Sequence, residues 1–212
     1  MRRLLITGPD STLSDTYELA LEAWPERRIE KIFFPSKDYY DFDISGLKNY
    51  SPLNWDIVVA VNEFYINDVR RALQKKISDL GYKFNSIISP LAKISVDATI
   101  GLNTIIHSGC FIGSNSKVGS HCVLRPNVVL SENVNIKDYA TLEANVAIRE
   151  LCSIGNFVTI CANSSLLRST TIEDHCYLNI TRQYSGKIST GTFFSPFFPE
   201  PIKIIGATKN QH

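Results

Sequence analysis

An apolar residue stands at every sixth position of this chain from residue 88 to residue 178. Each of these positions holds Ile, Leu or Val, and four residues after each of the first fifteen comes Ala, Thr, Cys, Ser or Val. Neither the period of an α-helix nor that of an ordinary strand produces this spacing. Two inward positions per hexad, one branched and one small, suit a tightly wound triangular coil. The pattern therefore predicts a left-handed parallel β-helix with five coils of three hexads between residues 88 and 177.

Corner positions of the predicted coils support the same fold. The fourth residue of many hexads is Asn or Gly, the residue types that best tolerate a left-handed backbone in a sharp turn. These residues are Asn103, Gly109, Asn115, Asn127, Asn133, Asn145 and Asn163. His121 and His175 also fall at fourth positions, so they are expected on corners rather than in a catalytic centre.

The cysteines are interpreted as packing residues. The chain has five of them and no CxxC pair, so neither a disulfide framework nor a zinc site is indicated, and no metal is expected. Four cysteines occupy the small inward position of a hexad: Cys110, Cys122, Cys152 and Cys176.

The charge balance limits the range of partners. The formal net charge is +1, which provides no field of one sign to attract nucleic acid or a membrane surface. No apolar run approaches the roughly 20 residues needed to span a bilayer, and the first residues do not resemble a signal peptide. A cytoplasmic protein without nucleic-acid or membrane partners is therefore expected.

Residues 1–86 have a different pattern, in which strands and helices alternate. Strands are expected at 4–7, 29–34 and 56–61, an extended run at 84–88, and helices at 11–24 and 66–80. This order predicts a Rossmann-like α/β domain with a small parallel sheet. Such sheets bind ligands beyond the carboxyl ends of their strands, here near residues 8–11, 35–36 and 62–63. There is no Gly-x-Gly-x-x-Gly motif, so a domain that only braces an assembly remains an alternative.

These patterns divide the chain into an α/β domain at 1–86, a β-helix at 87–180 and a C-terminal tail at 181–212. Residues 192–199 of the tail are aromatic and proline-rich, too apolar to extend freely into water. They are expected either to cover a neighbouring subunit or to line an acyl pocket larger than acetyl needs.

Four stretches, DIVVAVN at 56–62, DVRR at 68–71, ISDLGYK at 77–83 and IISP at 87–90, carry a family resemblance. With the hexads, they make the chain resemble the bacterial sugar O- and N-acyltransferases of the sialic acid O-acetyltransferase and bacillosamine-pathway aminosugar N-acetyltransferase type. The resemblance implies a homotrimer. The first domain of each chain would bind a nucleotide-linked aminosugar, with UDP or dTDP as the nucleotide. Acetyl-CoA or a longer acyl-CoA would bind in the cleft between neighbouring β-helices.

The resemblance also implies individual site residues. The nucleotide sugar would contact Gly8, Asn62 and Arg70, and coenzyme A would contact Thr141, Ala162 and Ile180. The sequence departs from the family at the nucleotide loop, which here reads Gly-Pro-Asp-Ser-Thr from residue 8. It also has Glu132 where the family has its general-base histidine, and Thr141 where a second family histidine lies near the thioester. Glu132 is therefore the candidate catalytic residue.

Residues 18 apart should stack about one strand spacing, ~4.8 Å, above one another in such a helix. One column is Ser114, Glu132, Glu150 and Arg168, and another is His107, Arg125, Glu143 and Cys161. The two stacked carboxylates repel each other, so one of them should take up a proton more readily. Arg168 is expected to keep Glu150 ionised, so Glu132 is the carboxylate expected to exchange a proton. Arg125 can pair with Glu143, and Arg125 and Glu150 are the further candidate contacts of the sugar nucleotide. Outward columns of a β-helix are often only solvated, so a structural role for both remains open.

The missing histidine favours N-acylation over O-acylation. A carboxylate is a poor base for an alcohol, but it can orient an amine or accept a proton from its ammonium form. An amine is already nucleophilic and needs mainly placement for direct attack on a thioester. The sequence therefore predicts an acyl-CoA-dependent N-acyltransferase acting on a nucleotide-linked aminosugar. A sugar O-acetyltransferase and a non-catalytic protein that binds nucleotide sugars remain the alternatives.

Overall fold

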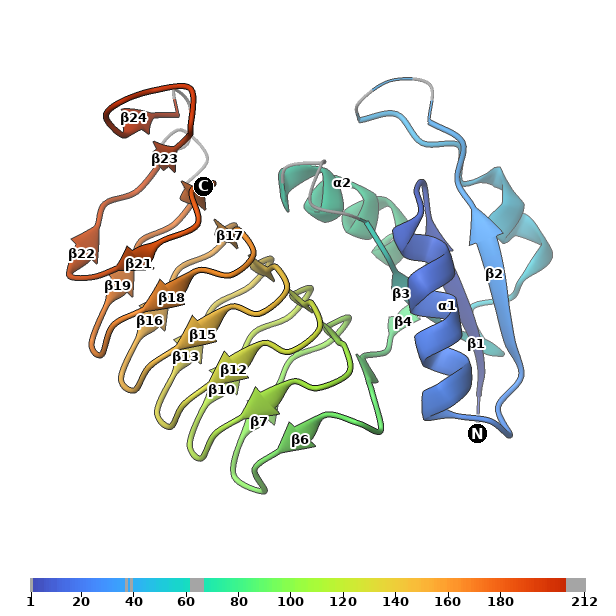
Figure 1. Ribbon diagram of the computed structural model, residues 1–212. Helices are drawn as coiled ribbons and strands as arrows, with labels where there is room; N and C mark the ends of the chain where they lie inside the picture. Colours follow the sequence, from blue (N-terminus) through green and yellow to red (C-terminus); the bar gives the residue numbers. More distant parts are fainter. Residues whose placement is uncertain (1, 37, 39, 62–66, 205–212) are drawn as a thin grey trace.

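The computed structural model describes residues 2–36, 38, 40–61 and 67–204 of the 212 (Figure 1). A small α/β unit at the N-terminus is followed by a long β-helix that begins beside it. Among the described residues, no helix combines the length and apolar character that crossing a membrane requires.

The α/β unit contains a four-stranded parallel sheet in the order β2-β1-β3-β4. Its strands are β1 (Arg3–Gly8), β2 (Ile29–Phe33), β3 (Trp55–Val59) and β4 (Lys83–Phe84). Its helices are α1 (Thr12–Ala23), α2 (Asn67–Ser78) and the short 3₁₀ helix η1 (Ser45–Asn49). The expected strands and helices are therefore present, with ends shifted by a few residues.

Strands β1 and β3 are apolar on both sides because each side of the sheet is covered. Alternate residues of β1, such as Leu5, pack with apolar residues of α2, such as Leu73. The residues between them, such as Leu4, pack with α1 and with Ile105 and Val123 of the β-helix. The apolar core on the α1 side of the sheet thus also contains residues of the first coils of the β-helix.

Three parallel sheets form the faces of the β-helix (Figure 1). The first face consists of β5 (Ile87–Ile88), β8 (Ile105–Ile106), β11 (Val123–Leu124), β14 (Thr141–Leu142), β17 (Thr159–Ile160), β20 (Tyr177–Leu178), β23 (Thr192–Phe194) and the antiparallel β24 (Ile202–Lys203). The second face consists of β6 (Lys93–Ile94), β9 (Phe111–Ile112), β12 (Val129–Leu130), β15 (Ala147–Ile148), β18 (Ser165–Leu166) and β21 (Gln183–Tyr184). The third face consists of β7 (Thr99–Ile100), β10 (Lys117–Val118), β13 (Asn135–Ile136), β16 (Ser153–Ile154), β19 (Thr171–Ile172) and β22 (Lys187–Ile188).

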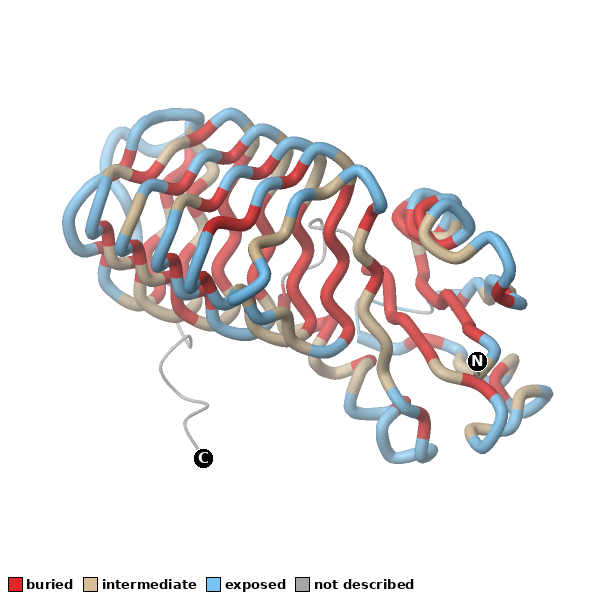
Figure 2. The backbone as a smooth tube through the Cα atoms, turned by 90° about the horizontal axis from the view of Figure 1, so that it is seen from below, coloured by how far each residue is buried: buried red, intermediate tan, exposed pale blue. Residues whose placement is uncertain are grey.

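Hexad residues fill the inside of the coils, as expected. Leu124 pairs with Ile106 below and Leu142 above, so the register is 18 residues per coil. The four cysteines assigned to packing all lie in this core, and all five cysteines of the chain are free and buried. Figure 2 shows the buried positions running along the inside of successive coils.

Corners of the coil adopt the left-handed backbone that the Asn and Gly pattern predicts. All seven predicted Asn and Gly corners have positive φ, between 52° and 71°. So do Leu151, Phe157 and other residues whose type gives no such signal. Left-handed backbone costs an ordinary residue about 1–2 kcal/mol, so the coil imposes it there through the strand pairing on either side.

The β-helix continues past the expected boundary at residue 180. Strands β21 and β22 complete a sixth coil, and β23 adds one more strand to the first face. Ile188 pairs with Ile172 and Phe194 with Leu178, a spacing of 16 residues instead of 18. The hexad pattern stops because this coil is shorter, with corners at Gly186 and Gly191.

Part of the predicted tail therefore closes the end of its own β-helix. The Phe193 ring stacks on Tyr177, with centroids 5.3 Å apart, and Phe194 packs edge-on against Tyr184. The ammonium group of Lys203 donates hydrogen bonds to the carbonyl oxygens of Ser189 and Thr190, at 3.2 and 2.8 Å.

One corner, between the third and first faces, carries a ladder of stacked rings. His121, Tyr139, Phe157 and His175 stack with centroid distances of 4.6–4.9 Å, and Phe84 packs edge-on against His121. Helix α2 lies over this ladder, because Tyr139 donates a hydrogen bond to Gln74 at 3.0 Å. His121 is 7% exposed, and burial, with the nearby Arg70 charge, lowers its pKa from 6.5 to about 4.

We predict that His121 makes the fold sensitive to acid. Its pKa is lower in the folded chain than in the unfolded chain, so stability should fall as pH falls from about 6.5 towards 4. The loss between pH 7.5 and pH 5 should be about 2 kcal/mol. His121→Phe should remove this component, since Phe157 already occupies the same corner with the same backbone.

Urea unfolding at pH 7.5 and pH 5 measures the effect. His175→Phe, further along the same ladder, is the matched control and should keep the acid sensitivity of the wild type. An unchanged pH dependence in His121→Phe would contradict the prediction.

Candidate functional site

The carboxyl edge of the N-terminal sheet meets the first face of the β-helix. The backbone N–H of Val59, at the end of β3, donates a hydrogen bond to Asn103 Oδ1 at 2.8 Å. The β-helix also donates a hydrogen bond to the α/β unit, from Arg125 Nη2 to Thr12 Oγ1 at the start of α1, at 3.4 Å. The strand ends where parallel sheets bind ligands thus lie directly against the β-helix.

Gly8 ends β1 at this edge and cannot carry a side chain. A Cβ atom there would lie 2.0 Å from the carbonyl oxygen of Ala60. The loop that follows is ordered by Asp10, whose Oδ1 accepts a hydrogen bond from the Thr12 backbone N–H at 2.8 Å. Gly8 thus lets the loop start close to the end of the neighbouring strand, and α1 begins from the carboxyl edge.

A polar column of the first face lies opposite this loop. The predicted stacking of His107, Arg125, Glu143 and Cys161 is confirmed, because each backbone N–H bonds to a carbonyl of the next coil at 2.9–3.0 Å. Glu143 Oε2 accepts a hydrogen bond from the Ala162 backbone N–H at 3.0 Å. The column brings a guanidinium group and a carboxylate next to the N-terminal unit.

Arg70, the third predicted contact of the nucleotide sugar, lies between α2 and the β-helix. It is 2% exposed and donates hydrogen bonds to the His121 carbonyl at 2.7 Å and to Thr141 Oγ1 at 2.8 Å. Asn67 bonds to Thr141 and Thr159 at 3.1 Å each. Arg70 therefore joins α2 to the β-helix, because a buried guanidinium needs several acceptors and the first face provides them.

The three predicted coenzyme A contacts are separated by this arrangement. Thr141 is completely buried under Arg70 and Asn67. Ala162 and Ile180 lie one above the other on the corner between the first and second faces, and both are half-buried.

Glu132 and Glu150 lie on the corner between the second and third faces, away from the N-terminal unit. Their predicted stacking with Ser114 is confirmed by backbone hydrogen bonds from Asn133 to Ser114 and from Leu151 to Glu132, at 2.9 and 3.3 Å. The predicted capping by Arg168 is wrong, because the ion-pair partner of Glu150 is Arg149, at 3.5 Å. Glu132 itself is exposed.

Within one chain, the predicted site residues are therefore dispersed. Arg70 and Thr141 lie in the junction with α2, and Ala162 and Ile180 lie on the corner between the first and second faces. Gly8 and Arg125 lie at the first face, together with Glu143, which is an addition to the predicted set. Glu132 and Glu150 lie at the opposite corner. Asn62 is outside the described residues.

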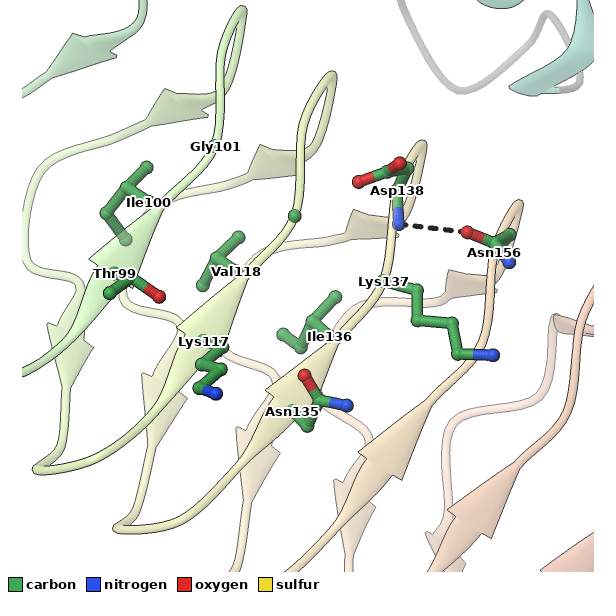
Figure 3. Close-up of a pocket in the computed structure, with 11 residues that line it drawn as sticks. Thr99, Ile100, Gly101, Lys117, Val118, Asn135, Ile136, Lys137, Asp138 and Asn156 are labelled. Carbon is green, nitrogen blue, oxygen red and sulfur yellow. Dashed lines mark hydrogen bonds between the residues drawn. The ribbon is translucent and has the colours of Figure 1, made fainter.

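A hollow on the third face involves none of the predicted residues (Figure 3). It has a volume of about 430 Å³ and is lined by side chains that include Thr99, Lys117, Asn135 and Lys137. Lys137 Nζ lies 3.9 Å from Asp174 Oδ1. No group of three His, Cys, Asp or Glu side chains within the described part of the chain is placed to hold a metal ion.

The junction of α2 with the β-helix is the feature that sequence reasoning missed. Asn67 and Thr159 bond to each other in it, and Asn103 joins the end of β3 to the first face nearby. A signal does exist, because outward residues of the first face change from Ile87, Ile105 and Val123 to threonines at 141 and 159. That change marks where the partner of the β-helix changes from the apolar face of α1 to the polar start of α2.

A small α/β unit followed by a left-handed parallel β-helix is the fold of hexapeptide-repeat sugar acyltransferases, the group that the sequence resembles. The acetyltransferase domain of PglB from Neisseria gonorrhoeae FA1090 matches with a TM-score of 0.79 and 18% identity, over 96% of this chain and 100% of that domain. The same domain in complex with acetyl coenzyme A matches with a TM-score of 0.75 and 17% identity, over 96% and 99%.

A mutant of the GDP-perosamine N-acetyltransferase from Caulobacter crescentus, in complex with CoA and GDP-perosamine, matches with a TM-score of 0.74 and 16% identity, over 92% of this chain and 94% of that one. No protein-family model matches the chain, and no curated protein matches its sequence. At these identities the likeness shows the fold.

We predict that Arg70 contributes to stability and that its neighbour Arg71 does not. Arg70→Leu leaves Thr141 and the His121 carbonyl without their donor, so the free energy of unfolding should fall by about 3 kcal/mol. Arg71 is a matched control, since it lies on the same helix and is half-buried with a 3.4 Å ion pair to Asp68. Arg71→Leu should cost less than about 1 kcal/mol. Equal losses in the two variants, measured by urea unfolding, would contradict the assignment.

Proposed function

We propose that this protein is an acyl-CoA-dependent N-acyltransferase that acts on a nucleotide-linked aminosugar. The observation that carries the proposal is the junction at the first face. There the carboxyl edge of a parallel sheet, the start of α1 and the guanidinium of Arg125 come together. The fold is that of proteins whose structures contain acetyl coenzyme A, or CoA with GDP-perosamine, which supports this choice of substrates.

The α/β unit serves as a Rossmann-like binding domain for the nucleotide sugar. Gly8 lets the loop after β1 start close to the end of β3, and Asn62 follows the end of β3 in the sequence. Arg125 is the cation next to this edge and would balance the charge of a diphosphate. UDP, dTDP and GDP are the nucleotides to be tested.

Coenzyme A binds along the corner that carries Ala162 and Ile180. Both residues are half-buried and lie on successive coils, so an extended pantetheine chain could contact both. No metal takes part in the proposed reaction.

The active site is completed by a second subunit of a homotrimer. Glu132 and Glu150 lie at the corner opposite the first face, so they can reach a sugar held at Arg125 only from a neighbouring chain. In this arrangement Glu132 orients the amine or accepts its proton, and Glu150 contacts the sugar. Exposed apolar side chains of the second face, Phe111 and Val129, are consistent with a subunit contact there.

The chemistry is direct acyl transfer. The amine nitrogen attacks the thioester carbonyl carbon, the C–S bond breaks, and the proton lost by nitrogen ends on the coenzyme A sulfur. An amide and a free thiol result. Placement of the amine is the main requirement, since an amine needs less activation than an alcohol.

We predict thiol release from acetyl-CoA or a longer acyl-CoA with at least one UDP-, dTDP- or GDP-linked 4-amino-4,6-dideoxyhexose. The matched 4-hydroxy sugars should release little thiol. Release with the hydroxy sugars alone would identify an O-acyltransferase. No release with any pair would favour a binding protein without catalytic activity.

We predict that Glu132→Ala lowers turnover by about 10²-fold if its carboxylate handles the amine proton, within the range of general-base groups. A loss below about 10-fold, mostly in the KM of the sugar, would mean that the amine attacks unaided. Wild-type kinetics would remove Glu132 from the site.

Mixed trimers test whether the site is shared. Glu132→Ala and Arg125→Ala subunits should each be impaired alone. When they are mixed in equal amounts, random assembly should restore about a quarter of the sites, because those sites combine an intact Arg125 with an intact Glu132. If sedimentation confirms a trimer and the mixture recovers no activity, Arg125 and Glu132 do not form a site shared between two subunits.

A further inference from the structure

We propose that Glu143 recognises the amino group of the acceptor sugar and so selects aminosugars over hydroxy sugars. This inference rests on the proposed function, and it assigns a role to a residue outside the predicted site set. It concerns binding of the acceptor, before any acyl group is transferred.

Position is the first reason. Glu143 lies one coil above Arg125 on the first face, because the Arg125 N–H bonds to the carbonyl of Leu142 at 2.9 Å. Adjacent coils are ~4.8 Å apart, so the two side chains start from neighbouring points. Arg125 extends to Thr12 at the start of α1. Two residues before Glu143, Thr141 bonds to Arg70 and Asn67 of α2, so Glu143 follows directly after the point where the β-helix meets the N-terminal unit.

Orientation is the second reason. Glu143 is half-buried, and its Oε2 is held at 3.0 Å by the Ala162 backbone N–H. A carboxylate offers about four lone-pair sites, so it can accept hydrogen bonds from several donors at once. Holding the group in place lowers the entropy cost of binding a donor.

Ala162 adds a third reason, because it is also one of the proposed coenzyme A contacts. Glu143 thus contacts one proposed coenzyme A residue and lies one coil from the proposed sugar nucleotide contact, Arg125. An amine bound to Glu143 would lie between the two substrates, which is where the nucleophile must be for direct attack.

Charge explains the selectivity. A carboxylate forms a stronger, charge-assisted hydrogen bond with an ammonium group than with a neutral hydroxyl. A site built around such a bond discriminates strongly against an analogue that lacks the donor charge. Arg125 repels an ammonium, so the opposite charge of Glu143 is also needed to tolerate an aminosugar next to it.

Glu173 provides a matched control elsewhere on the β-helix. Its Oε2 also accepts a backbone N–H from the following coil, that of Thr190, at 3.0 Å. It lies at the end of β19 on the third face, and its other partner is Lys187 at 2.7 Å. Glu143 and Glu173 therefore share the same local contact, and only Glu143 adjoins the N-terminal unit.

The test measures binding without an acyl donor. Calorimetry compares three aminosugar nucleotides, GDP-perosamine and the UDP and dTDP derivatives of 4-amino-4,6-dideoxyglucose, with their 4-hydroxy counterparts. The proteins are the full-length wild type, Glu143→Gln and Glu173→Gln. Glutamine keeps the acceptor for the Ala162 N–H and removes only the charge, and thermal unfolding checks that each variant is folded.

Glu143→Gln should raise the Kd of the aminosugar nucleotide that the wild type binds by about 10-fold or more. It should change the Kd of the hydroxy counterpart by less than about 2-fold, and Glu173→Gln should change neither. Equal weakening of both ligands by Glu143→Gln, or no weakening, would overturn the proposal. If the wild type binds the aminosugar nucleotide with this selectivity and yet releases no thiol from any acyl-CoA, the proposed transferase function fails while the role of Glu143 stands.

Discussion

The stacking register of the β-helix is the constraint on which the rest of this structure depends. Each coil must return the chain to the same point so that Leu124 lies on Ile106 and under Leu142. That register closes the core, and it forces left-handed backbone even on Phe157. It also stacks every outward residue on its counterpart in the next coil. The polar column with Arg125 and Glu143 is a direct result of it.

A second constraint places the α/β unit on this column. Apolar outward residues such as Ile105 pack with α1, and the buried Arg70 ties the start of α2 to Thr141. Both contacts lie on the first face, so they hold the carboxyl edge of the sheet against these coils. A guanidinium in such a place is stabilising only when its acceptors are present, which links the folding of α2 to that of the β-helix.

This geometry divides the proposed chemistry between the first face and the opposite corner. Under the proposed function, the sugar nucleotide binds at the first face, and Glu132 lies on the opposite side of the same coils. A single chain is therefore an incomplete enzyme under the proposed function, and a trimer would bring the two sides together. Glu143 differs from Glu132 in this respect, since it already adjoins the N-terminal unit in its own chain.

The sequence by itself determined the β-helix, its 18-residue register and the order of strands and helices before it, because a strict period of six fits only one repeating structure. It did not reveal the sixth coil, where the spacing falls to 16 residues. Only the tertiary structure decided that Arg70 and Thr141 bind each other and that Glu150 pairs with Arg149. Those contacts join residues whose separation along the chain carries no periodic signal, so their partners follow from how the α/β unit packs and from the directions of side chains at the corners.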